Sequence, residues 1–347
     1  MKVLVAMSGG VDSSVAAARM VADGHEVIGV TLKLWVGPSG EMPTAGCCTV
    51  SDSEDARRVA AQLDIPYYVL DYTEDFSTGV IDGFVADYLS GRTPNPCVEC
   101  NRTVKFSRLM AQAAEFDCEL VATGHYARVD RHEGRHRLRR GADEAKDQSY
   151  VLSMLGQEQL ARVRFPVGDL EKSEVRAMAA DLGLRTAYKA ESMDICFVGR
   201  RGYRSFLRLQ APEAVEPGVL VTVEGREVGI HDGIAGFTVG QRRGLGVALG
   251  EPHYVVDVDA PTRTVTIGTR DRLASAGLEM TQVTWTHTPL VPGEPTLLQY
   301  RAHGEAVDAV WNGDGTVTFM EPQMAVAPGQ TAALYRGDEV LGGGIIR

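Results

Sequence analysis

The residues of this sequence whose types and spacing could do chemistry fall into two sets. The first is a glycine- and serine-rich string near the N-terminus, Ser8-Gly9-Gly10-Val11-Asp12-Ser13-Ser14. Its glycines permit positive φ, so successive backbone N–H groups can converge on an anion, and a helix beginning near Ser13 would add its own unpaired N–H groups. The serine hydroxyls can donate hydrogen bonds, and Asp12 can orient the loop or hold Mg²⁺ against a pyrophosphate. The string therefore predicts a phosphate-binding loop.

Two common nucleotide-binding motifs are absent from this string. No Gly-Lys-Ser/Thr follows the glycines, as a Walker loop requires, and the Gly-x-Gly-x-x-Gly spacing that would support hydride chemistry is missing. For a Gly-Gly pair alone, an ordinary tight strand-to-helix turn is the alternative. Here the whole string follows the first predicted strand of an α/β sheet, where ligands bind, and this position favours phosphate binding.

The second set is the cysteines. None of the six lies after Cys196, so a secreted, disulfide-stapled fold is excluded and a reducing compartment is expected. Cys97 and Cys100 follow two prolines that oppose helix, which predicts a shaped loop. Four zinc ligands at suitable spacing are missing, and a thioredoxin-like site would place the pair at a helix start. Cys118 is expected to be structural, because cysteine is commonly buried.

The elements that must position these residues alternate along the first 125 residues. Strands are predicted over 3–7, 26–34, 67–70 and 120–123, and helices over 15–22, 55–63, 80–89 and 105–114. Val3 to Met7 is a continuous apolar run, typical of a strand buried on both faces of a parallel sheet. The alternation indicates an α/β fold with a doubly wound parallel sheet. Residues 160–184 follow a mostly helical pattern, interrupted at 165–168.

After about residue 210 the sequence changes to short β-prone segments punctuated by glycine and proline. The segments 219–223, 264–267, 296–300, 307–311 and 316–319 alternate with turns such as Asn312-Gly313-Asp314-Gly315. Many short strands at this spacing are typical of a small barrel or sandwich. We expect a catalytic α/β domain at 1–205, a small central, mostly-β domain at 206–273 and a C-terminal β-barrel at 274–347.

Composition and charge narrow the class of protein further. Hydrophobic residues make up 44% and charged residues 23%, ordinary values for a soluble globular protein. No window approaches the roughly 18 apolar residues of a spanning helix, and the first apolar run is too short for a secretory signal, so we expect a soluble, cytoplasmic protein with no membrane partner. The net charge of -11 would on average repel nucleic acid. Two clusters of arginines are locally basic in spite of this negative net charge, although such clusters are most often solvated surface. They consist of Arg131, Arg135, Arg137, Arg139 and Arg140, and of Arg200, Arg201, Arg204 and Arg208.

Several strings carry a resemblance to a known family. The loop at Ser8–Ser14 resembles the PP-loop of ATP-pyrophosphatases, which adenylate a substrate oxygen and release pyrophosphate, and it implies an adenine nucleotide alpha hydrolase-like fold. The string Gly91-Arg92-Thr93-Pro94-Asn95-Pro96, followed by Cys100-Asn101 and a later Cys196-Phe197-Val198-Gly199, resembles the tRNA-specific 2-thiouridylases. Further matching strings occur in the family's order through most of the chain, at 47–48, 55–60, 123–126, 146–150, 165–168, 238–246, 321–323, 328–330 and 341–346.

This resemblance implies a tRNA-uridine 2-sulfurtransferase that thiolates the wobble uridine of Lys-, Glu- and Gln-type tRNAs at the expense of ATP. It places ATP, with Mg²⁺, on Ala6, Met7, Ser8, Gly9, Gly10, Val11, Asp12, Ser13, Leu32 and Gly124. It places tRNA contacts on Lys146, Asp147 and Gln148 in the catalytic domain and on Gln299, Tyr300 and Arg301 in the barrel, and it makes the small central domain tRNA-binding. The resemblance also favours the two arginine clusters as contacts to tRNA phosphates, because such contacts position a nucleic acid without specifying its sequence. A sulfur-donor protein or a cysteine desulfurase is the other partner implied.

The resemblance also gives the cysteines their roles, with a persulfide on Cys196 and Cys100 as the nucleophile. Uracil O2 is a poor leaving group, so it is first adenylated at the ATP α-phosphate after the base has left its stack. The persulfide then attacks C2, and Cys100 attacks the Cys196 sulfur and leaves a Cys100–Cys196 disulfide for reduction. Released sulfide that attacks C2 itself is an alternative. Both thiols need lowered pKa values.

Cys97 is a departure from the family, because many members have Asp at this position. Cys97, Cys100 and Cys196 could supply three thiolates to an iron–sulfur cluster of the [4Fe–4S] type, with one iron open to bind sulfide. Cluster-dependent thiolation is therefore an alternative to the persulfide route, as is a neutral substitution beside a working pair.

Other assignments stay open at this point. A non-catalytic tRNA-binding protein or a PP-loop ligase for a small metabolite would not need both the intact loop and the paired cysteines. His125 is expected to pack beside the nucleotide rather than act in catalysis, and Asp194 to be a surface or capping residue rather than an acid or base. Cys47 and Cys48 are expected to have a buried or loop role rather than form a redox pair.

Overall fold

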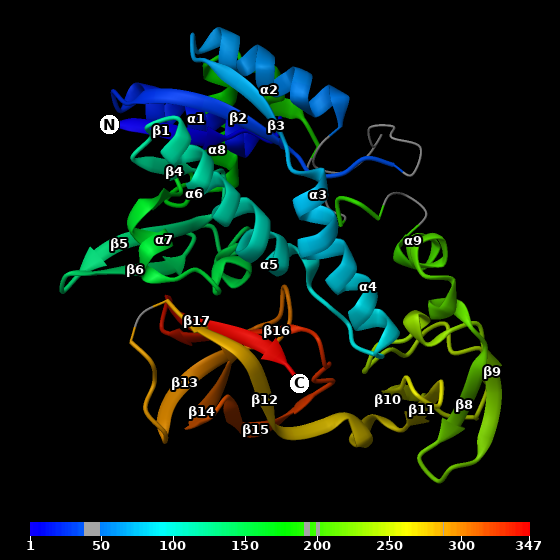
Figure 1. Ribbon diagram of the computed structural model, residues 1–347. Helices are drawn as coiled ribbons and strands as arrows, with labels where there is room; N and C mark the ends of the chain where they lie inside the picture. The colour runs from blue at the N-terminus through cyan, green and yellow to red at the C-terminus, as the bar shows by residue number, and fades with distance from the viewer. Residues whose placement is uncertain (38–48, 191–194, 199–201, 287) are drawn as a thin grey trace.

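The computed structural model describes residues 1–37, 49–190, 195–198, 202–286 and 288–347 (Figure 1). The expectations for Cys47, Cys48, Asp194, Arg200 and Arg201 fall outside these residues. Within the described ranges, no helix combines the length and the apolar character needed to cross a membrane.

A five-stranded parallel sheet forms the N-terminal part of the chain. Its strands lie in the order β3-β2-β1-β4-β7, with bounds β1 (Lys2–Ala6), β2 (Glu26–Lys33), β3 (Tyr67–Asp71), β4 (Leu120–Ala122) and β7 (Val163–Arg164). Alternate residues of β1 enter different hydrophobic clusters: Leu4 belongs to one, and Val3 and Val5 to the other. Both faces are therefore buried, and the prediction of a doubly wound parallel sheet is confirmed.

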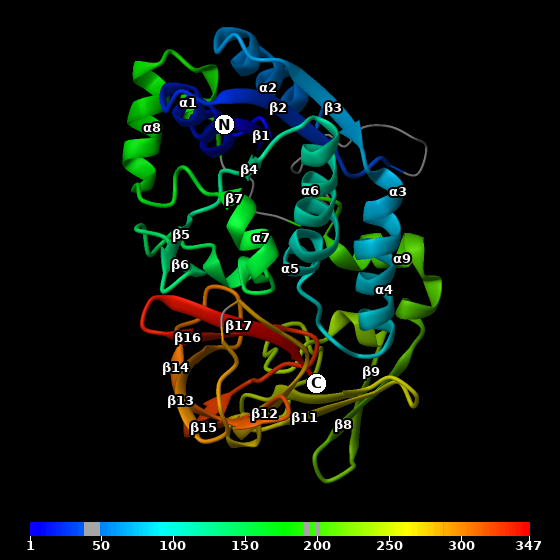
Figure 2. The ribbon, with the colours of Figure 1, turned by 60° about the vertical axis from the view of Figure 1, so that its left-hand side comes forward.

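Helices cover both faces of this sheet (Figure 2). One face packs on α1 (Val11–Ala22), α2 (Val50–Gln62) and α8 (Lys172–Asp181), and the other on α4 (Asp82–Leu89) and α6 (Phe106–Glu115). A π-helical turn at Ser77–Ile81 joins α3 (Thr73–Phe76) to α4. A second one, at Cys100–Lys105, joins α5 (Pro96–Glu99) to α6, and the short α7 (Gln157–Arg162) leads directly into β7.

Three local predictions differ from the structure. The first helix starts at Val11 rather than near Ser13, because Gly10 is extended and serves as its N-cap. The interruption of the helical pattern in 160–184 begins at Val163, where β7 adds the fifth strand to the sheet. The loop predicted at Cys97 and Cys100 is wrong as well. Pro96 is the first residue of α5, a position where the missing N–H and fixed φ of proline suit a helix.

The central part of the chain is a small β unit. After α9 (Tyr203–Gln210), it contains β8 (Gly218–Thr222), β9 (Glu227–His231), β10 (Tyr254–Asp259) and β11 (Thr264–Gly268), in the order β10-β11-β8-β9. Its own hydrophobic cluster includes Leu220, Val255, Val265 and Ile267. The expected change to short β segments after residue 210 is thus confirmed.

A closed six-stranded barrel ends the chain, as the spacing of its short segments predicts. The strands are β12 (Ala274–Trp285), β13 (Glu294–Gln299), β14 (Val307–Gly313), β15 (Thr316–Met324), β16 (Thr331–Arg336) and β17 (Glu339–Ile346), and the pairing of β12 with β17 closes the ring. A hairpin from the N-terminal part, β5 (Ala127–His132) and β6 (Arg135–Arg140), joins the same sheet by pairing β6 with β17. The sequence patterns did not predict this hairpin.

Candidate active site

The glycine- and serine-rich string forms a braced loop between β1 and α1. The Met7 N–H donates to the Val30 carbonyl (2.8 Å), which holds the start of the loop against β2. The Ser8 N–H donates to Ser13 Oγ (3.1 Å), and the Ser13 and Ser14 hydroxyls donate to the Gly10 carbonyl (3.1 and 2.8 Å). The loop is thus wrapped around the first turn of α1, whose free N–H groups and positive dipole end suit an anion.

Two glycines are required here for lack of space. Gly9 has φ +73°, and a Cβ on it would lie 2.1 Å from the carbonyl oxygen of Asp52 in α2. A Cβ on Gly124, which follows β4, would lie 2.6 Å from the Ser13 nitrogen at the start of α1. Both contacts are with backbone atoms, so neither can be relieved by a side-chain rotation.

A cavity of about 220 Å³ opens at the carboxyl ends of β1, β2 and β4. The strand order reverses direction between β1 and β4, and open α/β sheets bind ligands at such a switch point. The lining includes most of the residues expected to hold ATP, namely Ala6, Met7, Ser8, Asp12, Ser13, Leu32 and Gly124, with Thr31, Lys105, His125 and Gln148 among the others. Gly9, Gly10 and Val11 shape the loop without lining the cavity.

Asp12 is held by two side chains that sequence reasoning missed. Lys172 Nζ, at the first position of α8, donates to both carboxylate oxygens of Asp12 (2.8 Å each), and the Tyr126 hydroxyl donates to one of them (2.7 Å). The side chains of Lys172 and Asp12 are only 12% and 29% exposed. Asp12 is therefore an orienting group in this arrangement, with its charge compensated.

A second missed lysine lies beneath the loop. Lys189 Nζ donates to the Gly9 carbonyl (2.9 Å), to Asp52 (2.7 Å) and to Asp55 (2.6 Å). Burial alone would raise the pKa of Asp52, but hydrogen bonds from Lys189 and Thr49 outweigh it and lower that pKa. Lys189 thus ties the PP-loop and the start of α2 to the segment that leads to Cys196. Nothing in the spacing of the sequence pointed to either lysine.

His125 lies in the cavity wall between two aromatic rings. Its ring centroid is 5.9 Å from that of Phe106 and 6.0 Å from that of Phe165, and its Nδ1 is 2.7 Å from the Thr123 hydroxyl. Burial, with a smaller contribution from the charge of Lys105, lowers the pKa of His125 to about 3. The imidazole is therefore neutral at pH 7, which fits the packing role expected for it.

The Cys97–Cys100 pair lies at the start of a helix. Asn95 caps α5, since its side-chain oxygen accepts from the N–H groups of Cys97 (3.2 Å) and Val98 (3.4 Å). Cys97 is exposed, whereas Cys100 is 5% exposed and belongs to the hydrophobic cluster on the α4/α6 face of the sheet. The placement the sequence argued against, a Cys-x-x-Cys at a helix start, is the one observed.

Cys196 packs against the same cluster as Cys100. Its neighbour Phe197 is buried in that cluster, with edge-to-face contacts to Phe76 and Phe84 at ring-centroid distances of 5.6 and 5.1 Å. These contacts fix the short segment 195–198 beside the sheet. The disulfide expected between Cys100 and Cys196 is not formed among the described residues. Cys118 is buried, and burial raises the pKa of its thiol, in keeping with the structural role expected for it.

The four cysteines that the structure describes do not assemble into a metal site. Within the described part of the chain, no group of three or more His, Cys, Asp or Glu side chains is placed to hold a metal ion. Cys97, Cys100 and Cys196 all lie in that part. As they are placed in the structure, these three thiols are therefore not grouped as the ligands of a cluster; Cys97 lies at the surface and Cys100 in the core.

The segment expected to contact tRNA at 146–148 is bound into the protein. Asp147 is 7% exposed in its side chain and accepts from Arg140 (2.8 Å), the Gly141 N–H (2.9 Å) and both the N–H and hydroxyl of Ser149. Gln148 exchanges two hydrogen bonds with the backbone of Tyr126 (3.0 and 2.8 Å). Asp147 therefore acts as a buried structural carboxylate here.

The residues expected to contact tRNA in the barrel differ in exposure. Gln299 and Tyr300 are 5% and 2% exposed, and the Gln299 side-chain oxygen accepts from the Tyr335 hydroxyl (3.2 Å). Arg301 is exposed and lies over the Tyr300 ring, with its guanidinium carbon 5.0 Å from the ring centroid. Of these three side chains, Arg301 is the one presented to solvent.

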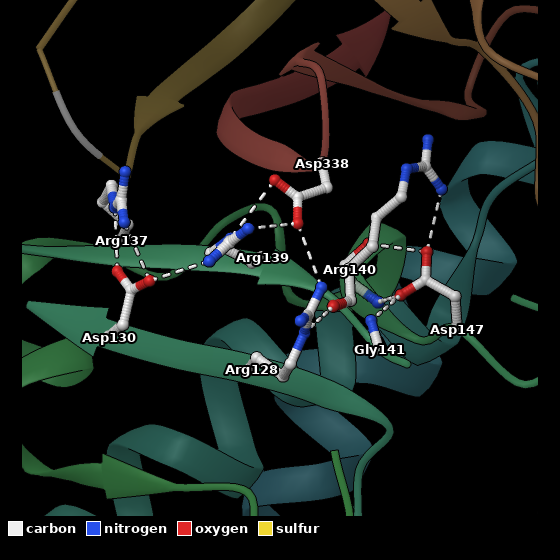
Figure 3. A network of polar contacts seen from close by, with 9 residues as sticks. Arg128, Asp130, Arg137, Arg139, Arg140, Gly141, Asp147 and Asp338 are labelled. Atoms are coloured by element: carbon white, nitrogen blue, oxygen red, sulfur yellow. Dashed lines mark hydrogen bonds and ion pairs between the residues drawn. The ribbon is translucent and has the colours of Figure 1, made fainter. Parts of the chain in front are cut away.

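Most arginines of the cluster at 131–140 form ion pairs within the protein (Figure 3). Arg137 forms a bidentate pair with Asp130 (2.8 and 2.8 Å), and Arg139 bridges Asp130 (3.1 Å) and Asp338 (2.6 Å). Asp338 lies on the turn between β16 and β17, so the Arg139–Asp338 pair fastens the β5–β6 hairpin to the barrel, whereas the pairs with Asp130 link the two strands of the hairpin. The remaining members, Arg131 and Arg135, are exposed near the hairpin turn.

A larger cavity, of about 470 Å³, lies between α4, α5 and the barrel strands β12 and β17. Its arginines are already paired: Arg92 with Asp87, Arg102 with Glu99 and Arg347 with Glu279. The PP-loop does not line it. We therefore assign the candidate nucleotide site to the smaller cavity, where the loop and the helix terminus converge.

Comparison with known proteins covers the whole chain. Residues 1–200 match the family described as tRNA methyl transferase HUP domain, 204–269 the tRNA methyl transferase PRC-barrel domain and 275–346 the aminomethyltransferase beta-barrel domain. The chain is 48% identical to the tRNA-specific 2-thiouridylase MnmA of Roseiflexus sp. (strain RS-1), over 99% of both chains. It is 47% identical to the protein of that name from Geotalea uraniireducens (strain Rf4), over 99% of this chain and 94% of the other. Among solved structures, a 4-thiouridine synthetase–RNA complex with bound ATP matches 61% of this chain and 50% of its own, with TM-score 0.39 and 18% identity.

Proposed function

The chain belongs to the tRNA-specific 2-thiouridylase family, and from that premise we propose that it transfers sulfur to C2 of the wobble uridine of tRNA, forming 2-thiouridine, AMP and pyrophosphate. One observation carries the proposal beyond the similarity. The PP-loop cavity and the two cysteines that sulfur transfer requires are built on the same sheet, with Cys100 and Cys196 in one cluster. Activation of the base and delivery of sulfur can therefore occur side by side.

ATP binds in the cavity formed by Ala6 to Ser13, Leu32 and Gly124 under this proposal. The loop N–H groups and the α1 terminus face the phosphates, where they neutralise the pyrophosphate that departs as uracil O2 attacks the α-phosphate. Asp12, fixed by Lys172 and Tyr126, keeps the first turn of α1 in place. Mg²⁺ enters with ATP as part of the substrate, held chiefly by its phosphates, because both Asp12 oxygens already accept hydrogen bonds.

Sulfur is delivered by a Cys196 persulfide. Its terminal sulfur attacks C2 of the adenylated base and AMP leaves. The Cys100 thiolate then attacks the Cys196 sulfur, which frees the thiocarbonyl and leaves a Cys100–Cys196 disulfide. The alternative routed through an iron–sulfur cluster on Cys97, Cys100 and Cys196 finds no three-thiol group in the described residues, so we derive no step through it.

The tRNA contacts we propose combine predicted and exposed residues. Lys146, Gln148 and Arg301 remain candidates, together with exposed Arg131 and Arg135, whereas Asp147, Gln299 and Tyr300 would act by supporting their neighbours. We propose that the chain works as the three units 1–205, 206–273 and 274–347, in the cytoplasm, with a cysteine desulfurase or another protein as sulfur donor. The basic residues would contact phosphates and position the RNA.

A tRNA-dependent assay tests the proposal. Purified protein is loaded with persulfide and given wobble-uridine tRNA and ATP, and AMP and 2-thiouridine are both measured, with total iron determined on the same sample. We expect AMP and 2-thiouridine in equal amounts from iron-free protein, no 2-thiouridine from Cys100→Ser or Cys196→Ser, and near-normal activity from the control Cys118→Ala. AMP formation without tRNA would point to a small-metabolite ligase, tRNA binding without turnover to a binding protein, and activity that requires iron to a cluster enzyme.

A further inference from the structure

We propose that Cys97 is a third redox-active thiol, which opens the Cys100–Cys196 disulfide after each turnover and moves the oxidised bond to the surface as a Cys97–Cys100 disulfide. The inference rests on the proposed persulfide route, which ends with an oxidised enzyme and does not itself use Cys97. It assigns Cys97 the role of resolving thiol.

The helix at Cys97 has the geometry that such an exchange needs. Cys97 is the second residue of α5, and Cys100 follows three residues later with helical dihedrals (φ -59°, ψ -43°). Residues three apart in a helix have Cα atoms about 5 Å apart. That spacing falls inside the range of roughly 4.4–6.8 Å over which a disulfide forms without backbone movement. The Asn95 cap and Pro96 fix the start of this helix, so the spacing is held rather than incidental.

Burial separates the three thiols into an inner pair and an outer member. Cys100 is 5% exposed, Cys196 is half-buried against the same cluster, and Cys97 is exposed to solvent. Thiol–disulfide exchange requires direct in-line contact between sulfur atoms, so access limits its rate. A protein dithiol is too large to reach Cys100 Sγ in the core, and half-buried Cys196 gives it only partial access. Cys97 offers it an attack point one helical turn from Cys100.

The exchange balances in atoms and electrons. The Cys97 thiolate attacks Cys100 Sγ, the Cys100–Cys196 bond breaks, and Cys196 leaves as a thiolate that is ready to accept a new sulfur. The two oxidising equivalents now reside in the Cys97–Cys100 bond. An external protein dithiol then attacks Cys97 Sγ to give a mixed disulfide, its second thiol closes its own disulfide, and Cys97 and Cys100 return to the reduced state.

Peptide mapping after a single turnover tests the exchange directly. Persulfide-loaded protein is given tRNA and ATP without reductant, then quenched with iodoacetamide and digested under non-reducing conditions. We expect wild type to contain a Cys97–Cys100 disulfide with alkylated Cys196, and Cys97→Ser to contain a Cys100–Cys196 disulfide instead. The yield of 2-thiouridine in that single turnover should be the same for both proteins and for the control Cys118→Ala.

Multiple turnover supplies a second readout. With thioredoxin as the sole reductant, we expect Cys97→Ser to turn over at least tenfold more slowly than wild type, and a small phosphine reductant to restore its rate. A thioredoxin variant that lacks its second active-site cysteine should be trapped on Cys97. A wild-type map with alkylated Cys97 and an intact Cys100–Cys196 disulfide would overturn the proposal, as would equal turnover of both proteins with thioredoxin. Absence of 2-thiouridine in the single turnover of wild type would instead reject the proposed function.

Discussion

Replacing Gly9 by Ala should deform the PP-loop, and the structure lets the cost be divided into two parts. Gly9 has φ +73°, a left-handed conformation that costs a side chain about 1–2 kcal/mol. Its Cβ would also lie 2.1 Å from the Asp52 carbonyl oxygen, and overpacking of this kind costs typically about 1–3 kcal/mol. The two contributions together predict that the variant is destabilised by about 2–5 kcal/mol.

Gly24→Ala is a matched control that separates these contributions. Gly24 has nearly the same φ, +78°, but nothing lies within 4 Å of the Cβ that the substitution would add. It therefore measures the conformational cost alone. The difference in unfolding free energy between the two variants therefore measures the clash with α2. The loop can relieve this clash only by moving away from Asp52, out of the position in which its N–H groups converge.

The assay is calorimetric titration with a non-hydrolysable ATP analogue, with urea unfolding recorded for both variants. If the loop must restore the clash of about 1–3 kcal/mol in order to bind, the binding free energy is less favourable by that amount. Gly9→Ala then binds the analogue roughly 5- to 150-fold more weakly than Gly24→Ala, because each 1.4 kcal/mol is a factor of ten in affinity. Equal affinity of the two variants, with equal unfolding midpoints, would refute the assignment of this loop as the phosphate site and its dependence on Gly9.

Three further predictions concern contacts of Lys172, His125 and Asp338. Lys172→Met leaves Asp12 without its cation in a largely shielded position, so the rate of tRNA-dependent AMP formation should fall about tenfold or more. The control Lys33→Met breaks an exposed ion pair and should have the same rate as wild type. Burial lowers the pKa of His125 to about 3 in the folded state, so the free energy of unfolding should decline as the pH falls from about 6.5 towards 3. The decline should reach at most about 1.4 kcal/mol per pH unit. Urea unfolding should show this slope in wild type and a shallower slope in His125→Gln. Asp338→Asn weakens half-exposed ion pairs between hairpin and barrel, so the unfolding free energy should drop by about 1 kcal/mol or less, and a drop of several kcal/mol would contradict that ranking.

The sequence predicted what is encoded locally. The apolar run at 3–7, the glycine string behind it and the alternation of strand and helix patterns suffice for the sheet, the PP-loop and the face on which ligands bind. Lys172 and Lys189 could not be found in this way, because they reach Asp12 and Gly9 across 160 and 180 residues of chain. Only the packing of the C-terminal part of the α/β domain brings those ammonium groups to the loop.

Two errors have local physical causes. The loop predicted at Cys97 rests on the rule that proline opposes helix, but Pro96 is the first residue of α5, a position where the proline ring costs no hydrogen bond. The β5–β6 hairpin carries a turn signal at Glu133 and Gly134, both of which have positive φ (49° and 81°), as a two-residue hairpin turn requires. The basic run on β6 obscured that signal, because one of the two acids that neutralise its arginines, Asp338, lies 199 residues from Arg139 in the sequence, although the other, Asp130, lies in the same hairpin.

The segment 146–148 connects the proposed tRNA surface to the nucleotide loop. Gln148 accepts from the Tyr126 backbone N–H, and the Tyr126 hydroxyl donates to Asp12, which Lys172 holds at the base of α1. Every link in this chain is a hydrogen bond of 3.0 Å or less. An RNA bound at Gln148, as we propose, would touch a residue two hydrogen-bonded steps from the PP-loop carboxylate. The proposed tRNA contact and the proposed phosphate site would then share one hydrogen-bonded set of groups rather than belong to two independent parts of the protein.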